Sequence, residues 1–331
     1  MSEASVGHRR YARPCEIYVT GTRHFALVER GIQFLLVSKN SVSSRVSTAI
    51  ARAAMQPYPS PSLLRAKFDP NYGVPLKGKR VLITGASSGI GEEAAYRFGQ
   101  LGAKVIVVAR REDLLSEVAA RITADGGEAD AIACDLSDLD AIDKLVETVT
   151  ERHGGVDILV NNAGRSIRRA THESLDRWHD AERTMQLNYF SPLRLIRGFA
   201  PGMVERRSGH IINVATWGVL NDVVPKFAVY NASKAALSTV SRIVDAEYGK
   251  YNVHTSTLYF PLVRTPMIAP TDAFTDAPAL TSAEAAEWMV LAARVRPARI
   301  APRFSVLAAT VNAVAPELVT RMARTGPETL G

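Results

Sequence analysis

Short, nearly continuous apolar runs alternate with longer stretches of helical composition from residue 80 onward, and this alternation restricts the fold more than any other feature. A strand that is apolar at successive positions is buried on both faces, and the stretches between the runs are long enough for crossover helices. We therefore predict an α/β fold with a doubly wound parallel sheet of about seven strands and helices on both faces. The predicted strands are 80–84, 104–109, 129–134, 156–160, 210–215, 253–259 and a short last one at 299–302.

The chain divides by composition near residue 70. Residues 1–70 carry ten Lys or Arg and four Asp or Glu, whereas the other 261 residues carry thirty and twenty-nine. The segment MQPYPSPS (55–62) is typical of a linker, because proline fits neither helix interiors nor central strands. We predict a basic arm with a Pro/Ser linker at 1–70, either partly disordered or interfacial, and a main domain at 71–331 that ends in a helical segment. An interfacial arm would make peripheral contact with a membrane.

Cysteine content and hydropathy indicate the compartment. Cys15 and Cys134 provide neither a disulfide framework nor metal-ligand spacing, so we expect a reducing environment and no metal site. The chain has no run of 18 apolar residues that would predict a transmembrane helix. We predict a cytoplasmic protein without a nucleic-acid partner, with contact at the inner membrane surface through residues 1–70 as the alternative location.

A glycine-rich turn joins the first predicted strand to the following helix in RVLITGASSGIGEEAAYRFG (80–99). Glycine permits the tight turn, lets the backbone approach a pyrophosphate and allows close contact between helix and strand. The free N–H groups of the helix N-terminus favour phosphate. This context predicts a Rossmann-type dinucleotide site rather than an ordinary glycine turn, with contacts from Gly85, Ser87, Ser88, Gly89, Ile90 and Gly91.

The second predicted strand ends in Arg110 and Arg111, where such folds read the ribose 2′ position. Arginine accepts a 2′-phosphate through paired hydrogen bonds, whereas an acidic residue prefers the free hydroxyl. Glu112 and Asp113 follow one helical step later. We therefore expect NADP(H), with NAD(H) as the alternative; both arginines could also be solvated loop charges.

Several motifs occur in order and together resemble those of the short-chain dehydrogenase/reductase superfamily: TGASSGIG (84–91), NNAG (161–164), Asn188, YNASK (230–234) and PLVRTPM (261–267). Residues 161–190, 261–271 and 280–302 are also similar to bacterial fatty acyl-CoA reductases that form aldehydes. The resemblance implies that 71–331 is an NADP-binding short-chain reductase domain in a homo-oligomer. It further implies cofactor contacts by Asp135, Asn161, Ala163, Gly164, Tyr230, Lys234, Pro261, Val263 and Thr265.

Tyr230 and Lys234 are four residues apart, which places them on one face of a helix. Free tyrosine has a pKa of about 10, and we expect the Lys234 ammonium to lower it. Thr216 stands where the superfamily usually has serine, and its hydroxyl has the same donor and acceptor capacity. By the same resemblance Asn188 supports a proton relay to Lys234. We therefore predict Asn188, Thr216, Tyr230 and Lys234 as the catalytic residues.

The resemblance implies NADPH-dependent reduction of a long-chain fatty acyl-CoA to the aldehyde, with Tyr230 as proton donor. The active-site motifs would serve equally in a carbonyl or alcohol dehydrogenase acting on an aldehyde, a ketone or a steroid. A non-catalytic NADP-binding protein is the third hypothesis. Arg165, Arg168 and Arg169 follow the NNAG motif and could meet CoA phosphates or remain a solvated basic loop.

Overall fold

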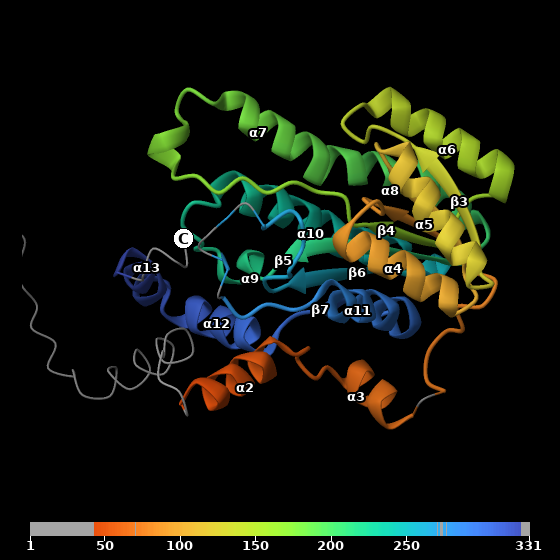
Figure 1. Ribbon diagram of the computed structural model, residues 1–331. Coiled ribbons are helices and arrows are strands. Elements are labelled where there is room, and N and C mark those ends of the chain that lie inside the picture. Colours follow the sequence, from red (N-terminus) through yellow and green to blue (C-terminus); the bar gives the residue numbers. More distant parts are fainter. Residues whose placement is uncertain (1–42, 70, 270, 272–273, 276, 326–331) are drawn as a thin grey trace, which may run out of the picture. The chain divides into compact units, whose positions relative to one another are not determined.

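The computed structural model describes residues 43–69, 71–269, 271, 274–275 and 277–325 (Figure 1). The chain forms two compact units, residues 1–51 and 52–331. Residues 1–42 lie outside the described part, so the predicted arm and its membrane contact stay largely untested. Among the helices that are described, none combines the length and the apolar character needed to cross a membrane.

A seven-stranded, fully parallel sheet forms the centre of the larger unit (Figure 1). Its spatial order is β3-β2-β1-β4-β5-β6-β7, which confirms the predicted doubly wound architecture. The order reverses between β1 and β4, and in such sheets the ligand crevice lies at the carboxyl ends of the strands beside this point. The strands are β1 (Arg80–Thr84), β2 (Lys104–Ala109), β3 (Glu128–Ala133), β4 (Ile158–Asn161), β5 (Gly209–Thr216), β6 (Val253–Phe260) and β7 (Arg299–Ile300).

Helices cover both faces of this sheet (Figure 1). One face packs against α4 (Gly89–Gln100), α5 (Glu112–Ala124) and α11 (Ser282–Val295). The other packs against α6 (Leu139–His153), α8 (Ser191–Glu205) and α10 (Ala228–Tyr248). The other elements of the described residues are α2 (Ser43–Met55), α3 (Pro61–Phe68), η1 (Thr171–Ser174), α7 (Trp178–Met185), the π-helical η2 (Gln186–Phe190), α9 (Gly218–Asn221), η3 (Gly249–Tyr251), α12 (Arg303–Val314) and α13 (Pro316–Thr325).

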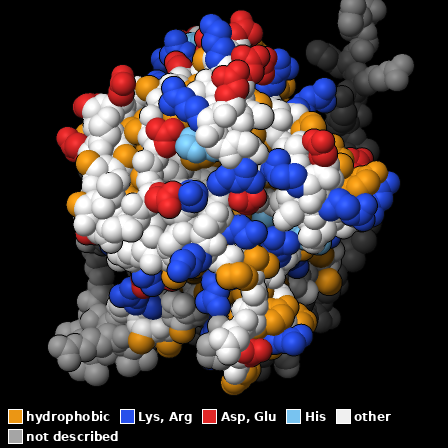
Figure 2. Space-filling view, turned by 90° about the vertical axis from the view of Figure 1, so that its right-hand side faces the viewer, with side chains coloured by type: hydrophobic (Ala, Val, Ile, Leu, Met, Phe, Trp, Pro, Cys, Tyr) orange, Lys and Arg blue, Asp and Glu red, His pale blue; other side chains and the backbone are white. Residues whose placement is uncertain are grey.

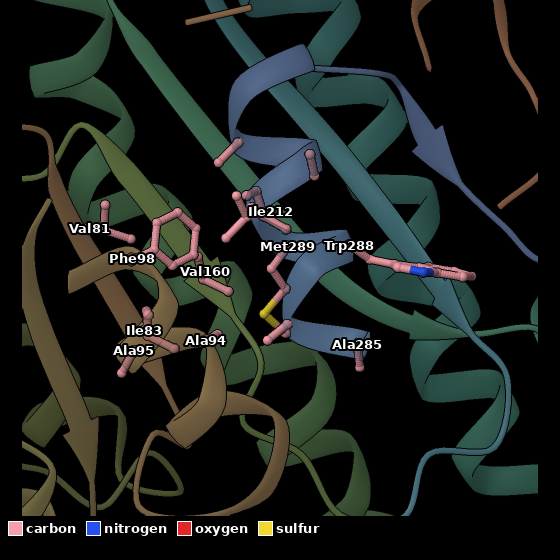
Figure 3. Close-up of a cluster of buried hydrophobic side chains, with 14 of the residues drawn as sticks. Val81, Ile83, Ala94, Ala95, Phe98, Val160, Ile212, Ala285, Trp288 and Met289 are labelled. Carbon is pink, nitrogen blue, oxygen red and sulfur yellow. The ribbon is translucent and has the colours of Figure 1, made fainter. Parts of the chain in front are cut away.

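Successive residues of each central strand enter two different cores, which explains the continuous apolar runs. Val81 and Ile83 pack with Phe98 of α4 and Met289 of α11, as Figure 3 shows. Leu82, between them, joins the cluster beneath α6 and α8. A parallel sheet buried in this way requires apolar residues at consecutive positions.

The Pro/Ser segment 55–62 lies inside the larger unit. Tyr58 N donates to Ala301 O at 2.8 Å, and Pro57 forms an isolated bridge with Pro302. Helix α3 follows, with the Ser60 hydroxyl accepting from Leu63 N, and Leu63 is buried in the α4–α11 core. These contacts place the segment beside the end of β7.

Charges of both signs are interspersed on the surface of the larger unit. In the view of Figure 2, Lys and Arg side chains lie among Asp and Glu side chains. Pairs such as Arg80 with Asp157 at 2.7 Å and Lys104 with Glu128 at 2.8 Å balance locally. Arg80 also donates to the carbonyl oxygens of His153 and Gly154 at 2.8 Å, so it fastens the end of α6 to β1.

Candidate active site

The glycine turn after β1 has the backbone that the sequence predicts for a dinucleotide site. Gly85 and Gly89 have φ values of +68° and +62°, a region that favours glycine. A Cβ on Gly91 would lie 2.3 Å from Gly85 O, so the first turn of α4 approaches the loop as only glycine allows. Ser88 at the helix N-cap makes no side-chain capping bond. The first-turn N–H groups therefore point toward a position where a phosphate fits.

The NNAG segment after β4 is interlocked with this turn. Asn162 Nδ2 donates to Thr84 O at 2.9 Å, and the Thr84 hydroxyl accepts from Asn162 N and Ala163 N, both at 3.0 Å. A Cβ on Gly85 would meet Ala163 Cα at 2.9 Å. Asn161, Ala163 and Gly164 are predicted cofactor contacts, whereas Thr84 and Asn162 were not predicted from the sequence. In the sequence, their possible role is indicated only by their positions: Thr84 directly precedes the first glycine of the turn, and Asn162 lies inside NNAG.

Arg111 reaches from the end of β2 to the glycine turn. Its Nη2 lies 3.1 Å from Ser87 Oγ and 3.5 Å from Ser88 Oγ. Arg110, beside it, is exposed. Asp135 follows β3, is exposed, and accepts from Ser137 N at 2.9 Å. The residues predicted to meet the adenosine half of a dinucleotide thus follow neighbouring strands β1, β2 and β3.

The segment after β6 closes over the same turn. Thr265 Cγ2 lies 3.2 Å from the position that a Cβ on Gly89 would take. Pro261 and Val263 are buried. Val263 forms a bridge with Leu280, and Leu280 N donates to Leu262 O at 2.9 Å. These contacts hold the predicted Pro261–Thr265 stretch against the start of α4.

Thr216, Tyr230 and Lys234 meet where β5 ends against α10. The Thr216 hydroxyl lies beside the Tyr230 phenol and acts to lower the pKa of that phenol. Lys234 is buried, and its Nζ donates to Val214 O at 2.9 Å. The Lys234 ammonium is thereby held by the strand that carries Thr216. A Cβ on Gly164 would lie 3.2 Å from this Nζ, so the NNAG segment passes directly beside it.

The pKa values of this pair reflect burial more than mutual attraction. Burial raises the pKa of Tyr230 to about 12, and the Thr216 hydroxyl only partly opposes it. Burial lowers the pKa of Lys234 to about 8. Our expectation of a lowered Tyr230 pKa is therefore wrong for the free protein, because desolvation disfavours the phenolate more than its neighbours favour it. At neutral pH the phenol carries its proton.

Asn188 lies at the middle of the π-helical turn η2 and is fully buried. Its Oδ1 accepts from Arg165 N at 2.9 Å, and its Nδ2 donates to Arg165 O at 2.9 Å and to Ser233 Oγ at 3.0 Å. Such π-helical turns often occur at functional sites because they redirect a side chain. The turn brings Asn188 beside Gly164, the residue that also faces Lys234. The sequence did not indicate the role of Ser233.

Two hydroxyls and an amine thus converge beside a turn suited to phosphate. A neutral phenol supported by a second hydroxyl can polarise a carbonyl oxygen and donate a proton to it. Among the residues that the structure describes, no three His, Cys, Asp or Glu side chains come together as ligands for a metal. The arrangement could transfer a proton next to a turn suited to a dinucleotide.

Comparisons with known proteins agree with this architecture. The family model described as short chain dehydrogenase matches residues 79–275. A metagenomic short-chain oxidoreductase solved in complex with NADP is 32% identical, with a TM-score of 0.58, and the match covers 66% of this chain and 92% of that one. L-Sorbose reductase from Gluconobacter frateurii, solved with NADPH and L-sorbose, is 29% identical, with a TM-score of 0.59 over 70% and 92% of the two chains.

Two curated relatives are more similar. A fatty acyl-CoA reductase of Mycobacterium tuberculosis is 62% identical over 275 residues, which are 82% of this chain and 92% of the relative. A fatty acyl-CoA reductase of Acinetobacter baylyi is 49% identical over 243 residues, 73% of this chain and 82% of the relative. With the sheet order, the glycine turn and the Tyr–Lys helix in agreement, the chain belongs to the short-chain dehydrogenase family of oxidoreductases and is close to its fatty acyl-CoA reductases.

Proposed function

We propose that the protein reduces a long-chain fatty acyl-CoA to the fatty aldehyde with NADPH. The choice of substrate is supported by the 62% identity to a fatty acyl-CoA reductase along 92% of that relative. The reaction class rests on the hydroxyl pair Thr216–Tyr230 beside buried Lys234. The bound cofactor would supply the hydride for the thioester carbonyl carbon.

The protein's own residues would manage the charge and the proton. Thr216 and Tyr230 donate hydrogen bonds to the carbonyl oxygen, where negative charge develops. Tyr230 then gives its proton to that oxygen, and the hemithioacetal breaks down to aldehyde and CoA. Lys234 forms no covalent bond in this scheme. Its ammonium stabilises the phenolate that Tyr230 becomes after giving up its proton. Asn188, fastened to Arg165 and Ser233, would connect Lys234 to a proton relay.

The residues fit a dinucleotide phosphate. The close approach of Gly91 to Gly85 and the uncapped start of α4 would hold the pyrophosphate. Arg111, which donates to Ser87, would grip a ribose 2′-phosphate together with that hydroxyl. This pairing supports NADPH over NADH.

One aromatic ring lies against Tyr230, and a second is stacked on the first. The ring of Phe227 lies 6.0 Å from that of Tyr230 and 6.5 Å from that of Phe274, centroid to centroid. These rings offer a surface for an acyl chain. Of the arginines proposed for CoA phosphates, Arg169 pairs with Asp180 at 2.6 Å, so its guanidinium already has a carboxylate partner.

Direct hydride transfer fits the cysteine environment. In the part of the chain that the structure covers, Cys134 is the free cysteine, and it is buried. Burial, with the nearby carboxylates of Asp135 and Asp138, raises the pKa of its thiol to about 11. Such a thiol is not a thiolate nucleophile at neutral pH.

The test follows NADPH absorbance with a long-chain acyl-CoA and, in parallel, with the matching aldehyde, while released thiol is titrated. NADPH consumption with stoichiometric CoA release supports the proposal. Consumption with the aldehyde alone places the protein among carbonyl reductases, for which the L-sorbose reductase neighbour is a precedent in fold. Consumption with neither substrate contradicts both reactions.

Cofactor choice is tested separately. Arg111→Ala should lower the ratio of kcat/KM for NADPH over NADH by about 10- to 100-fold, the effect of losing one or two charge-assisted hydrogen bonds. Arg110→Ala is the matched control and should change the ratio much less. The homo-oligomer and the membrane contact through residues 1–70 stay predictions, which sedimentation and vesicle co-sedimentation would test.

A further inference from the structure

The residue after the catalytic tyrosine is joined to the loop that follows Thr216. Asn231 Nδ2 donates to Gly218 O at 3.0 Å. Gly218 is the second residue beyond Thr216, so the bond links the end of β5 to the start of α10. In the sequence these two partners are separated by thirteen positions, and α9 with its following loop lies between them.

The contact depends on glycine at its strand end. A Cβ on Gly218 would lie 2.7 Å from Asn231 Oδ1 and 2.8 Å from Val224 Cγ2. No side chain fits at such distances without moving its neighbours. Gly218 is buried, so its carbonyl oxygen would otherwise depend on the α9 hydrogen bond from Asp222 N at 3.1 Å.

The segment between Gly218 and Asn231 contains two residues with positive φ, a backbone conformation that is uncommon for residues other than glycine. Asp222 and Lys226 have φ values of +58° and +68°, although neither is glycine. Such conformations are less stable locally and persist where surrounding contacts determine them. Trp217 N donates to Phe260 O at 3.0 Å, which fastens the other side of the same turn to β6. Residues 216–218 are therefore held from the sheet on one side and from α10 on the other.

We propose that Asn231 is a positioning residue that sets Thr216 against Tyr230 by holding Gly218. Tyr230 and Asn231 are adjacent on α10, and Thr216 and Gly218 are two apart, so this bond fixes the separation of the two catalytic hydroxyls. The bond aligns the end of β5 with the start of α10, although a long connection separates Thr216 from Tyr230 along the chain. The catalytic part of this inference rests on the proposed reductase reaction.

The kinetic test is a double-mutant cycle. Asn231→Ala should lower kcat about tenfold with little change in KM, because a small misplacement of a catalytic group costs rate rather than binding. Thr216→Val alone should cost about 10²-fold. In the Thr216→Val background, Asn231→Ala should cost almost nothing more, since its effect passes through the missing hydroxyl. Thr239→Ala, which removes a hydroxyl that bonds Ala235 O on the exposed side of α10, is the control.

A second measurement needs no substrate. In free Asn231→Ala protein, the amides of Trp217 and Asp222 should exchange with deuterium about tenfold faster, while amides in the second half of α10 remain unchanged. Unchanged exchange at both amides would overturn the proposed contact, whatever the reaction proves to be. Losses in kcat that simply multiply in the double mutant would overturn the positioning role. Failure of the wild type to reduce acyl-CoA would affect only the proposed function.

Discussion

Helices α10 and α11 pack on opposite faces of the same strands with opposite chemistry. The buried residues of α11 are all apolar, from Ala285 to Val295. Those of α10 are Ser233, Lys234, Leu237, Ser238 and Ser241, of which only Leu237 is apolar. Toward the sheet, α10 makes hydrogen bonds: Ser238 to Tyr259, and Ser241 to Thr255 at 3.0 Å.

The two helices therefore have different roles: α11 stabilises the sheet, whereas α10 sets the position of side chains against the sheet. Apolar contacts are non-directional and tolerate sliding, so α11 can stabilise the sheet without fixing one position to within tenths of an ångström. Hydrogen bonds are directional, and each bond from α10 accepts one register only. The face that carries the proposed site is therefore the one where helix and sheet meet through polar groups. The following predictions test this contrast, beginning with the largest effect.

Tyr230→Phe should abolish most activity without unfolding the protein. Loss of the proposed proton donor should lower kcat about 10³-fold, while the affinity for NADPH stays nearly unchanged. The measurement is single-turnover reduction together with NADPH fluorescence titration. A loss of less than about tenfold would assign the proton to another group.

Met289→Ala should act on stability alone. The side chain extends from α11 into the core that this helix shares with α4 and is fully buried (Figure 3), so its removal should cost about 2–5 kcal/mol in the free energy of unfolding. Urea denaturation measures this cost, and kcat at 25 °C should remain that of the wild type. Leu307→Ala on α12, where the side chain is 66% exposed, is the apolar control. A large change in kcat for Met289→Ala would break the proposed contrast.

His210 is a buried titratable group on the α11 side of the sheet, and it should make the fold acid-sensitive. It is fully buried with Nε2 2.9 Å from Ser256 Oγ, and burial lowers its pKa to about 3. The unfolded chain takes up this proton near pH 6.5, so stability present above that pH is lost as pH falls toward 3. The loss should be about 1.4 kcal/mol per pH unit.

His210→Gln should remove this dependence because glutamine does not titrate. The free energy of unfolding is measured by urea denaturation at pH 7 and at pH 5. Between these two pH values the wild type should lose about 2 kcal/mol more than the variant. Equal pH dependence in the two proteins would show that His210 is not the responsible group.

Two serines of α10 provide the smallest and most selective comparison. Ser233→Ala and Ser241→Ala should each cost about 1 kcal/mol of stability, since each removes a buried hydrogen-bonding hydroxyl. Only Ser233 bonds Asn188, so only Ser233→Ala should also lower kcat, by about three- to tenfold. Equal kcat for the two variants would argue against a role for the Ser233–Asn188 bond.

The sheet was predictable because its signals are local in the chain. Each expected strand overlaps an observed one, since a buried parallel strand must be apolar on both faces wherever it lies. The glycine turn was predictable as well, because positive φ at Gly85 and Gly89 selects glycine regardless of the surroundings. The direction of the Tyr230 pKa shift was not, because burial by distant segments outweighs a lysine one helical turn away.

The sequence by itself thus determined the doubly wound sheet, the glycine turn after β1 and the Tyr230–Lys234 face of one helix, since periodicity and backbone sterics act over a few residues. Only the tertiary structure decided which atoms meet: Arg111 with Ser87, Asn188 with Ser233, and Asn231 with Gly218. Their partners are thirteen or more positions away in the chain. Directional bonds across such distances depend on how helices are seated on the sheet, and no local pattern records that placement.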